Sequence, residues 1–256
     1  TEGNKPQDGG GLIVEAEDRA DVAADPFAAK YLRRLITAHG MLQGEDRWCL
    51  WLHNADPSDL RSSRVLQDRL RIVSNTRLAS PTPAAREKAK TPGLFLAIRQ
   101  PTSRWIGVPA HSSELRRIIP MAFFEPEDIS HNSLMQIDNA DEYLFGVLQS
   151  AMFTAWVKTV AGRLKSDIRI SADIAYNAFP FPDVNAVGHA RVAAAAVEVL
   201  EARKLYPAAT LADLYDPFAT PVELVKAHDA LDQAVDALYG NKKFAGEADR
   251  LEFLLD

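Results

Sequence analysis

The spacing of apolar residues predicts a chain that mixes helices and short strands before it becomes helical. Apolar residues recur every three or four positions in three early segments, which is typical of helices with one buried face. These segments are residues 26–43, 58–76 and 142–160. Short apolar runs bounded by polar or turn residues predict strands, because they are too short for helices. They lie at residues 47–52, 94–98, 105–108, 117–123 and 133–137.

The last third of the chain predicts only helices. It begins after the sequence break formed by Phe179, Pro180, Phe181 and Pro182. Residues 186–204 predict one helix. A second is expected to start at a capping box over residues 220–223, with Pro221 at its first position. Its apolar stripe then runs through Leu224, His228, Leu231, Val235 and Leu238.

These patterns predict an α+β fold with a C-terminal all-α helical subdomain. The mixed α/β domain is expected over residues 45–182 and the helical subdomain over residues 186–256. Residues 1–44 are expected to be a linker and helical lead-in, flexible over the Gly- and Asp-rich residues 1–11. The chain starts at Thr1 rather than Met and stops within an apolar segment, so we expect it to be part of a longer protein.

Composition narrows the class of protein without identifying it. The 256 residues include one cysteine, so an intramolecular disulfide is impossible and a reducing compartment, the cytoplasm, is expected. The sequence shows no signal peptide and no apolar run near the ~20 residues that span a bilayer, so no membrane partner is expected.

The charge distribution points to nucleic acid although the net charge is −6. Residues 61–117 hold 12 Lys and Arg against 3 Asp and Glu, a balance of +9, and residues 158–171 hold 4 against 1, a balance of +3. The rest of the chain is acidic. Local basic patches, rather than the total charge, decide where phosphate groups bind.

The segment from residue 162 to 171 carries the most specific pattern. Taken as one strand, it alternates an apolar face formed by Leu164, Ile168 and Ile170 with a polar face. The polar face is expected to hold Arg163, Lys165, Asp167, Arg169 and Ser171. On such a strand Lys165 and Asp167 lie about 6–7 Å apart.

Lys165 and Asp167 suit the reading of one base pair. A lysine donates hydrogen bonds to O6 and N7 of guanine in the major groove, and an aspartate accepts one from N4 of cytosine. Arg163 and Arg169 are able to bind phosphate or another guanine. The same alternation is also typical of a solvated strand face that carries Lys–Asp ion pairs.

Several stretches, in order along nearly the whole chain, resemble the MmeI-like type IIL restriction–modification enzymes. The similarity runs through Trp156–Ser171 and the segment from Ile174 to Pro182. It also covers Arg47–Leu52, Val108–Pro120, Leu211–Pro217 and Leu224–Asp232. Enzymes of this family are single chains that join a nuclease, an adenine-N6 methyltransferase and a target-recognition domain. The resemblance implies that this chain is the target-recognition domain followed by the C-terminal helical region.

The resemblance also implies partners and site residues. Double-stranded DNA and an N-terminal methyltransferase domain of the same parent chain are the expected partners. S-adenosylmethionine, and Mg for cleavage, are expected in the parent chain but not in this fragment, and the target adenine would be flipped out of the stack. In the family, the positions matching Lys165 and Asp167 select one base pair, and the position matching Arg169 contributes to another.

Further polar residues are candidates for contacts with the DNA backbone. They are Arg163, Ser171, Ser112, Ser113, Arg116 and Arg117. Because adjacent arginines on a strand point to opposite faces, only one of the last two needs to face DNA. Arg61, Arg64 and Arg71 form either a solvated helix face or a surface that follows phosphates.

No catalytic or metal site is predicted within these residues. The sequence has no Gly-rich cofactor loop, no HExxH and no Cys/His cluster, and Asn177-Ala178-Phe179-Pro180 lacks the first proline of the adenine methyltransferase motif. Two alternatives to DNA recognition remain at this stage. One is a protein-interaction module built on the acidic helical third, and the other is an enzyme that acts in isolation.

Overall fold

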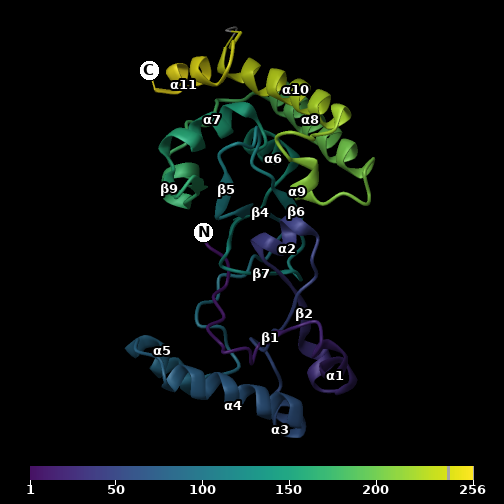
Figure 1. Cartoon of the computed structure of the whole chain (residues 1–256), viewed down its shortest axis with the longest axis vertical. Helices are drawn as coiled ribbons and strands as arrows, with labels where there is room; N and C mark the ends of the chain where they lie inside the picture. Colours follow the sequence, from purple (N-terminus) through teal and green to yellow (C-terminus); the bar gives the residue numbers. More distant parts are fainter. Residues whose placement is uncertain (241–242, 256) are drawn as a thin grey trace.

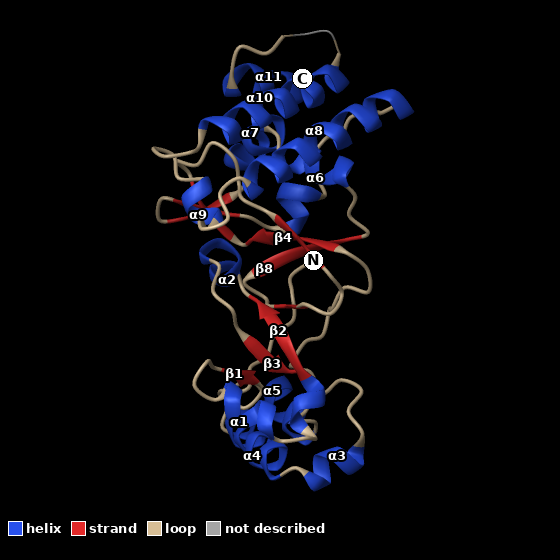
Figure 2. Cartoon of the chain, turned by 90° about the vertical axis from the view of Figure 1, so that its right-hand side faces the viewer, coloured by secondary structure: helices blue, strands red, loops and turns tan. Residues whose placement is uncertain are grey.

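The chain is elongated, with helices at both ends and the strands between them (Figures 1 and 2). This computed structural model describes residues 1–240 and 243–255, so Asn241, Lys242 and Asp256 of the predicted helical subdomain lie outside the described residues. The architecture is α+β with a helical C-terminal part, as the sequence predicts. None of the described helices is long and apolar enough to cross a bilayer.

A four-stranded sheet organises the N-terminal part. Its order is β1-β3-β2-β7, with the β2–β7 pair parallel and the other pairs antiparallel. The strands are β1 (Ile13–Val14), β2 (Leu32–Ile36), β3 (Trp48–Leu50) and β7 (Ile129–Ser130). The strand expected over residues 47–52 is confirmed by β3. The helix expected over residues 26–43 is wrong, because its middle pairs with β3 as strand β2.

Helices cover this sheet at the lower end of Figure 1. They are α1 (Arg19–Ala24), η1 (Ala28–Tyr31), α3 (Pro57–Ser62), α4 (Arg64–Leu78), α5 (Pro83–Glu87) and η2 (Lys88–Lys90). Helix α2 (Ala38–Gln43) lies higher, near the middle of the molecule. The helix expected over residues 58–76 is therefore divided at Ser63, whose hydroxyl caps α4 by accepting from Leu66 N. Leu66 and Val73 of α4 are buried against Leu12, Cys49 and Leu50.

Residues 1–11, predicted to be flexible, are held by hydrogen bonds within the fold. Gly3 N donates to Leu134 O at 2.9 Å, and the buried Asn4 side chain donates to Ser130 O at 2.9 Å. A Cβ at Gly3 would lie 2.4 Å from His131 O, so only glycine fits there. Asp8 accepts from the backbone N–H groups of Leu12 and Ile13. Glycine and aspartate serve close packing and turn formation here rather than flexibility.

A three-stranded antiparallel sheet, ordered β6-β4-β8, forms the centre of the molecule. Its strands are β4 (Trp105–Pro109), β6 (Ala122–Phe124) and β8 (Leu134–Asp138). The strands expected at residues 105–108 and 133–137 are confirmed. The strand expected over residues 117–123 is reduced to β6, and residues 94–98 form only a bridge between Ala97 and Lys5.

The apolar segment at residues 142–160 forms two helices rather than one. They are α6 (Glu142–Leu148) and α7 (Ala151–Val160). The break follows from Ser150, whose hydroxyl accepts from Phe153 N at 3.2 Å and so starts a new helix. Helix α7 ends at Val160, and strand β9 begins two residues later at Gly162.

The C-terminal helices share one apolar core with α6 and α7. They are α8 (Ala186–Lys204), α9 (Leu211–Leu214), α10 (Val222–Asp236), η4 (Ala237–Tyr239) and α11 (Glu247–Leu255). Helix α8 has the predicted bounds, and the predicted stripe of α10 is buried at Leu224, His228, Leu231 and Val235. The capping box lies at Thr210 and Asp213 of α9, not at residues 220–223 as predicted.

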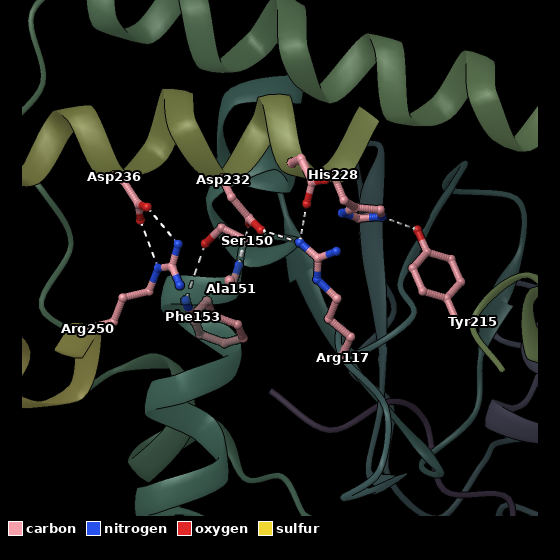
Figure 3. Close-up of polar contacts among 10 residues, drawn as sticks. Arg117, Ser150, Ala151, Phe153, Tyr215, His228, Asp232, Asp236 and Arg250 are labelled. Carbon is pink, nitrogen blue, oxygen red and sulfur yellow. Dashed lines mark hydrogen bonds and ion pairs between the residues drawn. The ribbon is translucent and has the colours of Figure 1, made fainter. Parts of the chain in front are cut away.

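A buried polar network joins these helices to the loop before β6. Arg203 of α8 donates to Met121 O at 2.8 Å, to Gln149 Oε1 at 2.5 Å and to the Tyr215 hydroxyl. The Tyr215 hydroxyl lies 2.7 Å from His228 Nε2, at the right of Figure 3. The hydroxyl accepts from Arg203 and also lies 3.4 Å from Gln149 Oε1. His228 stays neutral in this buried site. Burial and the nearby Arg203 and Arg117 lower the pKa of His228 from 6.5 to about 3.

We expect folding stability to fall as the pH drops below 6.5. The unfolded chain binds a proton at His228 below that pH, whereas the folded chain keeps the ring neutral down to about pH 3. The contribution of His228 is thus complete above pH 6.5, and about 2 kcal/mol of it is lost by pH 5. The check is the free energy of unfolding measured by denaturant at pH 7 and pH 5.

His228→Gln, which keeps a hydrogen-bond partner for Tyr215, is the control variant. It should be less stable at pH 7 and show a smaller loss on going to pH 5. His131, whose pKa is also lowered by burial, leaves a residual slope of the same sign. Equal slopes for His228→Gln and the unmodified protein would contradict the prediction.

Candidate nucleic-acid interface

A second three-stranded antiparallel sheet carries most of the predicted site residues. Its order is β5-β10-β9, with β5 (His111–Ser113), β10 (Asp167–Arg169) and β9 (Gly162–Leu164). Strands β9 and β10 form a hairpin closed by a two-residue turn at Lys165 and Ser166. The sheet lies directly below α7 at the upper left of Figure 1.

The expectation of one continuous strand over residues 163–171 is therefore wrong. A two-residue turn pairs Leu164 with Asp167 and Arg163 with Ile168, so side chains before the turn change faces relative to those after it. Lys165 occupies the turn with φ 57°, a conformation more usual for glycine. The sequence gives no sign of this turn, because Lys165 and Ser166 are not typical turn residues and the apolar spacing continues across them.

The outward face of the sheet differs from the predicted face before the turn but agrees with it after the turn. Asp167 and Arg169 face outward as predicted, opposite Ser113 and His111 of β5. Leu164, predicted to be buried, is 55% exposed beside Asp167. Arg163 lies on the other face, where it donates to Glu114 Oε2 at 2.6 Å and to Lys158 O at 3.2 Å.

Strand β5 corrects the prediction for Ser112 and adds His111. Ser112 pairs with the buried Ile168, and its hydroxyl is inaccessible and has no hydrogen-bond partner among the described residues. It therefore offers no contact to a ligand on the outward face. His111 is exposed directly opposite Arg169. His111 and Ser113 lie on the same face of β5, one on each side of Ser112, but only Ser112 and Ser113 were predicted as DNA contacts.

Lys165, Asp167 and Arg169 keep their polar groups free for a ligand. All three are exposed, and within residues 1–240 and 243–255 none of their side chains makes a hydrogen bond or ion pair. The Lys165–Asp167 ion pair of the alternative interpretation is not formed. Ser171, half-buried, follows the strand and lines a groove together with Arg169.

This groove brings further residues, not predicted from the sequence, next to Arg169 and Ser171. Its volume is about 840 Å³, and it lies between the end of β10, strand β8 and the N-terminus. Beside Arg169 and Ser171 it is lined by Arg99, His111, Asn132, Tyr176 and Asn177. The groove therefore combines cations, amides and an aromatic ring, the groups that bind phosphates and base edges.

The adjacent arginines after β5 do not lie on a strand, and they have different environments. Arg117 Nη2 donates to Asp229 Oδ1 at 2.5 Å and to Asp232 Oδ2 at 3.1 Å on helix α10 (Figure 3). It is bound to the C-terminal helices and not free for phosphate. Burial lowers the pKa of Arg116, which the nearby Asp167 and Asp216 partly offset. The Arg116 side chain donates no hydrogen bond to any of the described residues.

Half of the basic segment 61–117 has a structural role. Six of its twelve cations are buried or ion-paired within the chain: Arg64, Arg69, Arg71, Arg77, Arg104 and Arg117. Arg77 is the extreme case, fully buried and bound to five backbone carbonyls. The +9 balance therefore overstates the charge that is available for DNA.

The described residues contain no group of three or more His, Cys, Asp or Glu side chains that could hold a metal ion. The single cysteine, Cys49, is buried, and burial raises the pKa of its thiol above the ordinary range. It is thus neither a metal ligand nor an activated nucleophile in this fold.

Comparison with known proteins gives concordant matches over the whole chain. Residues 1–183 match the family model of the MmeI target recognition domain, and residues 184–256 that of the MmeI C-terminal domain. DNA methyltransferase A of Bacillus subtilis (strain 168) is 37% identical over 254 residues, which are 99% of this chain and 29% of that protein.

A solved structure shares the fold almost completely. The type IIL restriction–modification enzyme MmeI, in complex with DNA, superposes with a TM-score of 0.96 at 38% identity, over 99% of this chain and 34% of that chain. The chain thus spans about a third of the length of the proteins that it matches.

Proposed function

This chain belongs to the family of MmeI target recognition and C-terminal domains, and on that premise we propose that it reads the sequence of double-stranded DNA for a restriction–modification DNA methyltransferase. The observation that carries the proposal is the β9–β10 hairpin, which presents the side chains of Lys165, Asp167 and Arg169 without a hydrogen-bond or ion-pair partner among the described residues.

A two-stranded hairpin is a shape that the major groove of DNA admits. The major groove is about 12 Å wide and admits a two-stranded β-ribbon. Lys165, at the tip, is placed to donate to guanine, and Asp167, at the start of β10, to accept from the paired cytosine. Arg169 lies two residues further, about 6–7 Å along the strand, which corresponds to roughly two base-pair steps. Arg169 therefore contacts a different position of the site.

The remaining residues contribute affinity rather than sequence reading. Arg116, Ser113 and Ser171 surround the hairpin and are assigned to the DNA backbone, and His111 extends the outward face beside Arg169. Arg163 is held by Glu114 at the edge of the sheet and has a secondary role at most. We assign Ser112 and Arg117 to the structure of the domain.

The parent protein supplies the chemistry. We infer an N-terminal methyltransferase domain that binds S-adenosylmethionine and methylates adenine at N6, and a nuclease that uses Mg, in a bacterial cytoplasmic protein. The role of this chain is to hold the recognition sequence so that the target adenine is presented to that domain, flipped out of the stack.

The alternative of a protein-interaction module loses its main support in the fold. It relied on an exposed apolar stripe along the acidic helical third. In the structure this stripe is buried, because Leu224, Leu231 and Val235 of α10 pack into the core shared with α6 and α8. The helical region therefore acts as a support for the recognition domain.

The proposal predicts salt-dependent binding to duplex DNA, with Arg116 contributing to it. Replacing Arg116 by Ala should weaken binding to all duplexes alike and reduce the slope of log K against log salt by about one. The measurement is a titration of fluorescent duplexes at several salt concentrations. Lys204→Ala, which removes an exposed cation paired with Glu201 on α8, is the matched control and should leave the slope unchanged.

Two outcomes would contradict the proposal. Absence of salt-dependent binding by the unmodified protein would reject DNA recognition altogether. A change of sequence preference in Arg116→Ala at unaltered general affinity would show that Arg116 reads bases instead of phosphates.

A further inference from the structure

The β5-β10-β9 sheet, named the recognition sheet here, is flanked by two segments that both contact one carboxylate on helix α10. Four residues after the end of β5 lies Arg117, and two residues before the start of β9 lies the end of helix α7. Asp232 contacts both flanking elements, although it is more than 60 residues away from β10 in the sequence. Figure 3 shows Asp232 between Arg117 and the first turn of α7.

The two oxygens of Asp232 have separate partners. Oδ2 accepts from Arg117 Nη2 at 3.1 Å, and the same nitrogen donates to Asp229 Oδ1 at 2.5 Å. Oδ1 accepts from Ala151 N at 2.7 Å. Because each oxygen is engaged from a different direction, the carboxylate cannot rotate without losing one of the contacts.

The contact at Ala151 fixes the start of a rigid helix. The first N–H groups of a helix have no partner within the helix, and a negative charge at this end is favourable. Ser150 accepts from Phe153 N, and Asp232 accepts from Ala151 N, so two of these groups of α7 are satisfied. Helix α7 is ten residues long and mostly buried, so a displacement at Ala151 is transmitted to β9.

Burial makes these contacts costly to lose. Asp232 is 5% exposed, and burial raises the pKa of its carboxyl group although the Ala151 N–H and Arg117 act in the opposite direction. A buried carboxylate that loses its cationic partner is costly, so the three elements stay together as a unit.

We propose that Asp232 is a positioning residue for DNA recognition, which holds the loop after β5 and helix α7 against α10 and thereby sets the place of the β9–β10 hairpin. The inference rests on the proposed function of that hairpin. It gives the C-terminal helices a defined task, because a reading group displaced by about 1 Å no longer forms its contacts to a base edge.

The same helix offers a matched control. Asp236 lies one turn after Asp232 and is also largely buried, and it accepts from Arg250 Nη2 at 2.7 Å. Arg250 belongs to α11, which packs against α7 but does not lead into the β5-β10-β9 sheet. Removing the charge at Asp236 therefore breaks a buried ion pair of α10 while the contacts of Asp232 to Arg117 and Ala151 stay in place.

The experiment compares Asp232→Asn and Asp236→Asn in the complete protein. Each variant is incubated with a pool of short duplexes randomised at the central positions, and the bound fraction is sequenced. Asp232→Asn should lower the preference for the selected sequence over its single-mismatch relatives by about tenfold, the low end of one bidentate base contact. Asp236→Asn should keep the preference, and both should bind non-specific duplex as the unmodified protein does.

Hydrogen exchange separates positioning from general destabilisation. Faster exchange of the hairpin amides 162–169 in Asp232→Asn, but not in Asp236→Asn, supports the proposal. Arg117→Ala should produce the same loss of preference, and combining it with Asp232→Asn should add little, because both act through one contact.

The outcomes distinguish this inference from the proposed function. If the unmodified protein selects no sequence, the function itself is rejected. If it does select one, and the two Asn variants lose preference alike or not at all, the positioning role of Asp232 is rejected while DNA recognition stands.

Discussion

Exchanging the charges at the tip of the hairpin, by Lys165→Glu together with Asp167→Arg, is expected to invert one base pair of the recognition sequence from G·C to C·G. The carboxylate then accepts from cytosine N4 where an ammonium donated to guanine, and the guanidinium donates to guanine where a carboxylate accepted. The other positions of the recognition sequence should not change, because Arg169 and the β10 backbone stay in place.

The expected effect is large because, in the proposed function, each group reads a base directly. A good bidentate contact contributes about 1–3 kcal/mol of discrimination, so either single substitution should cost about 10- to 100-fold in preference for the original site. The double substitution should recover affinity on the inverted site. The structure favours tolerance of the change, since both side chains are exposed and neither has a partner inside the described parts of the chain.

The measurement is the sequence of the methylated sites after the double substitution is introduced into the complete protein. Arg163→Gln is the matched control. It alters a charge in the same hairpin, but on the opposite face, where Arg163 is bound to Glu114, so the site should stay the same. An unaltered motif for the double variant would falsify base reading by Lys165 and Asp167.

Replacing Arg77 by Met is expected to give the largest loss of stability in the N-terminal part. Arg77 is fully buried and forms no ion pair within the described residues, so its charge is stabilised by carbonyl oxygens and, without direct contact, by Asp8. It donates to the carbonyls of Pro6, Gln7, Lys88, Thr91 and Leu94 at 2.7–3.2 Å. One side chain thereby joins the N-terminal segment to α4 and to the loop after η2.

The cost follows from the acceptors that are left behind. Methionine fills similar space but donates nothing, so five carbonyls lose a charged donor in a buried site. Each unsatisfied buried group costs about 1–3 kcal/mol, and partial relaxation reduces the total, so we expect about 4 kcal/mol or more. Arg77→Lys should be intermediate, because an ammonium group cannot reach acceptors on all sides.

Denaturant unfolding and hydrogen exchange check this prediction. The midpoint should fall strongly for Arg77→Met, and exchange should accelerate over residues 6–14 and 88–96. Arg71→Ala on the same helix is the control. Its side chain is 71% exposed and paired only with Asp68, so the loss should stay below about 1 kcal/mol. Similar losses for both variants would show that burial of Arg77 contributes little.

The local sequence pattern was enough to predict those helices and strands that can be recognised without knowing what they pack against. Helix α8 begins and ends where the sequence predicts, and β3, β4, β8 and the buried stripe of α10 also agree. In these segments the signals that define the element are local: the spacing of apolar residues and the residues that begin or end the element are close together in the sequence. The family resemblance and the order of a mixed part followed by a helical part came from the sequence as well.

Only the tertiary structure decided which side chains of the hairpin face outward. The turn at Lys165 and Ser166 changes the side-chain alternation by one position, which exposes Leu164 and moves Arg163 to the other face. The turn contains neither glycine nor asparagine, the residues that usually mark a two-residue turn, so the alternation of polar and apolar residues appeared continuous. Where two strands pair, a difference of one residue in register reverses every assignment of faces.

The roles of the arginines were also decided by contacts that are distant in the sequence. Arg117 binds carboxylates 112 and 115 residues away, and Arg77 binds carbonyls about 70 residues before it. A sequence shows that these side chains are charged, and therefore that they must be solvated, paired or bound to a ligand. Which of the three applies depends on what the fold brings within about 3 Å of the guanidinium, and this proximity is a property of the packed chain.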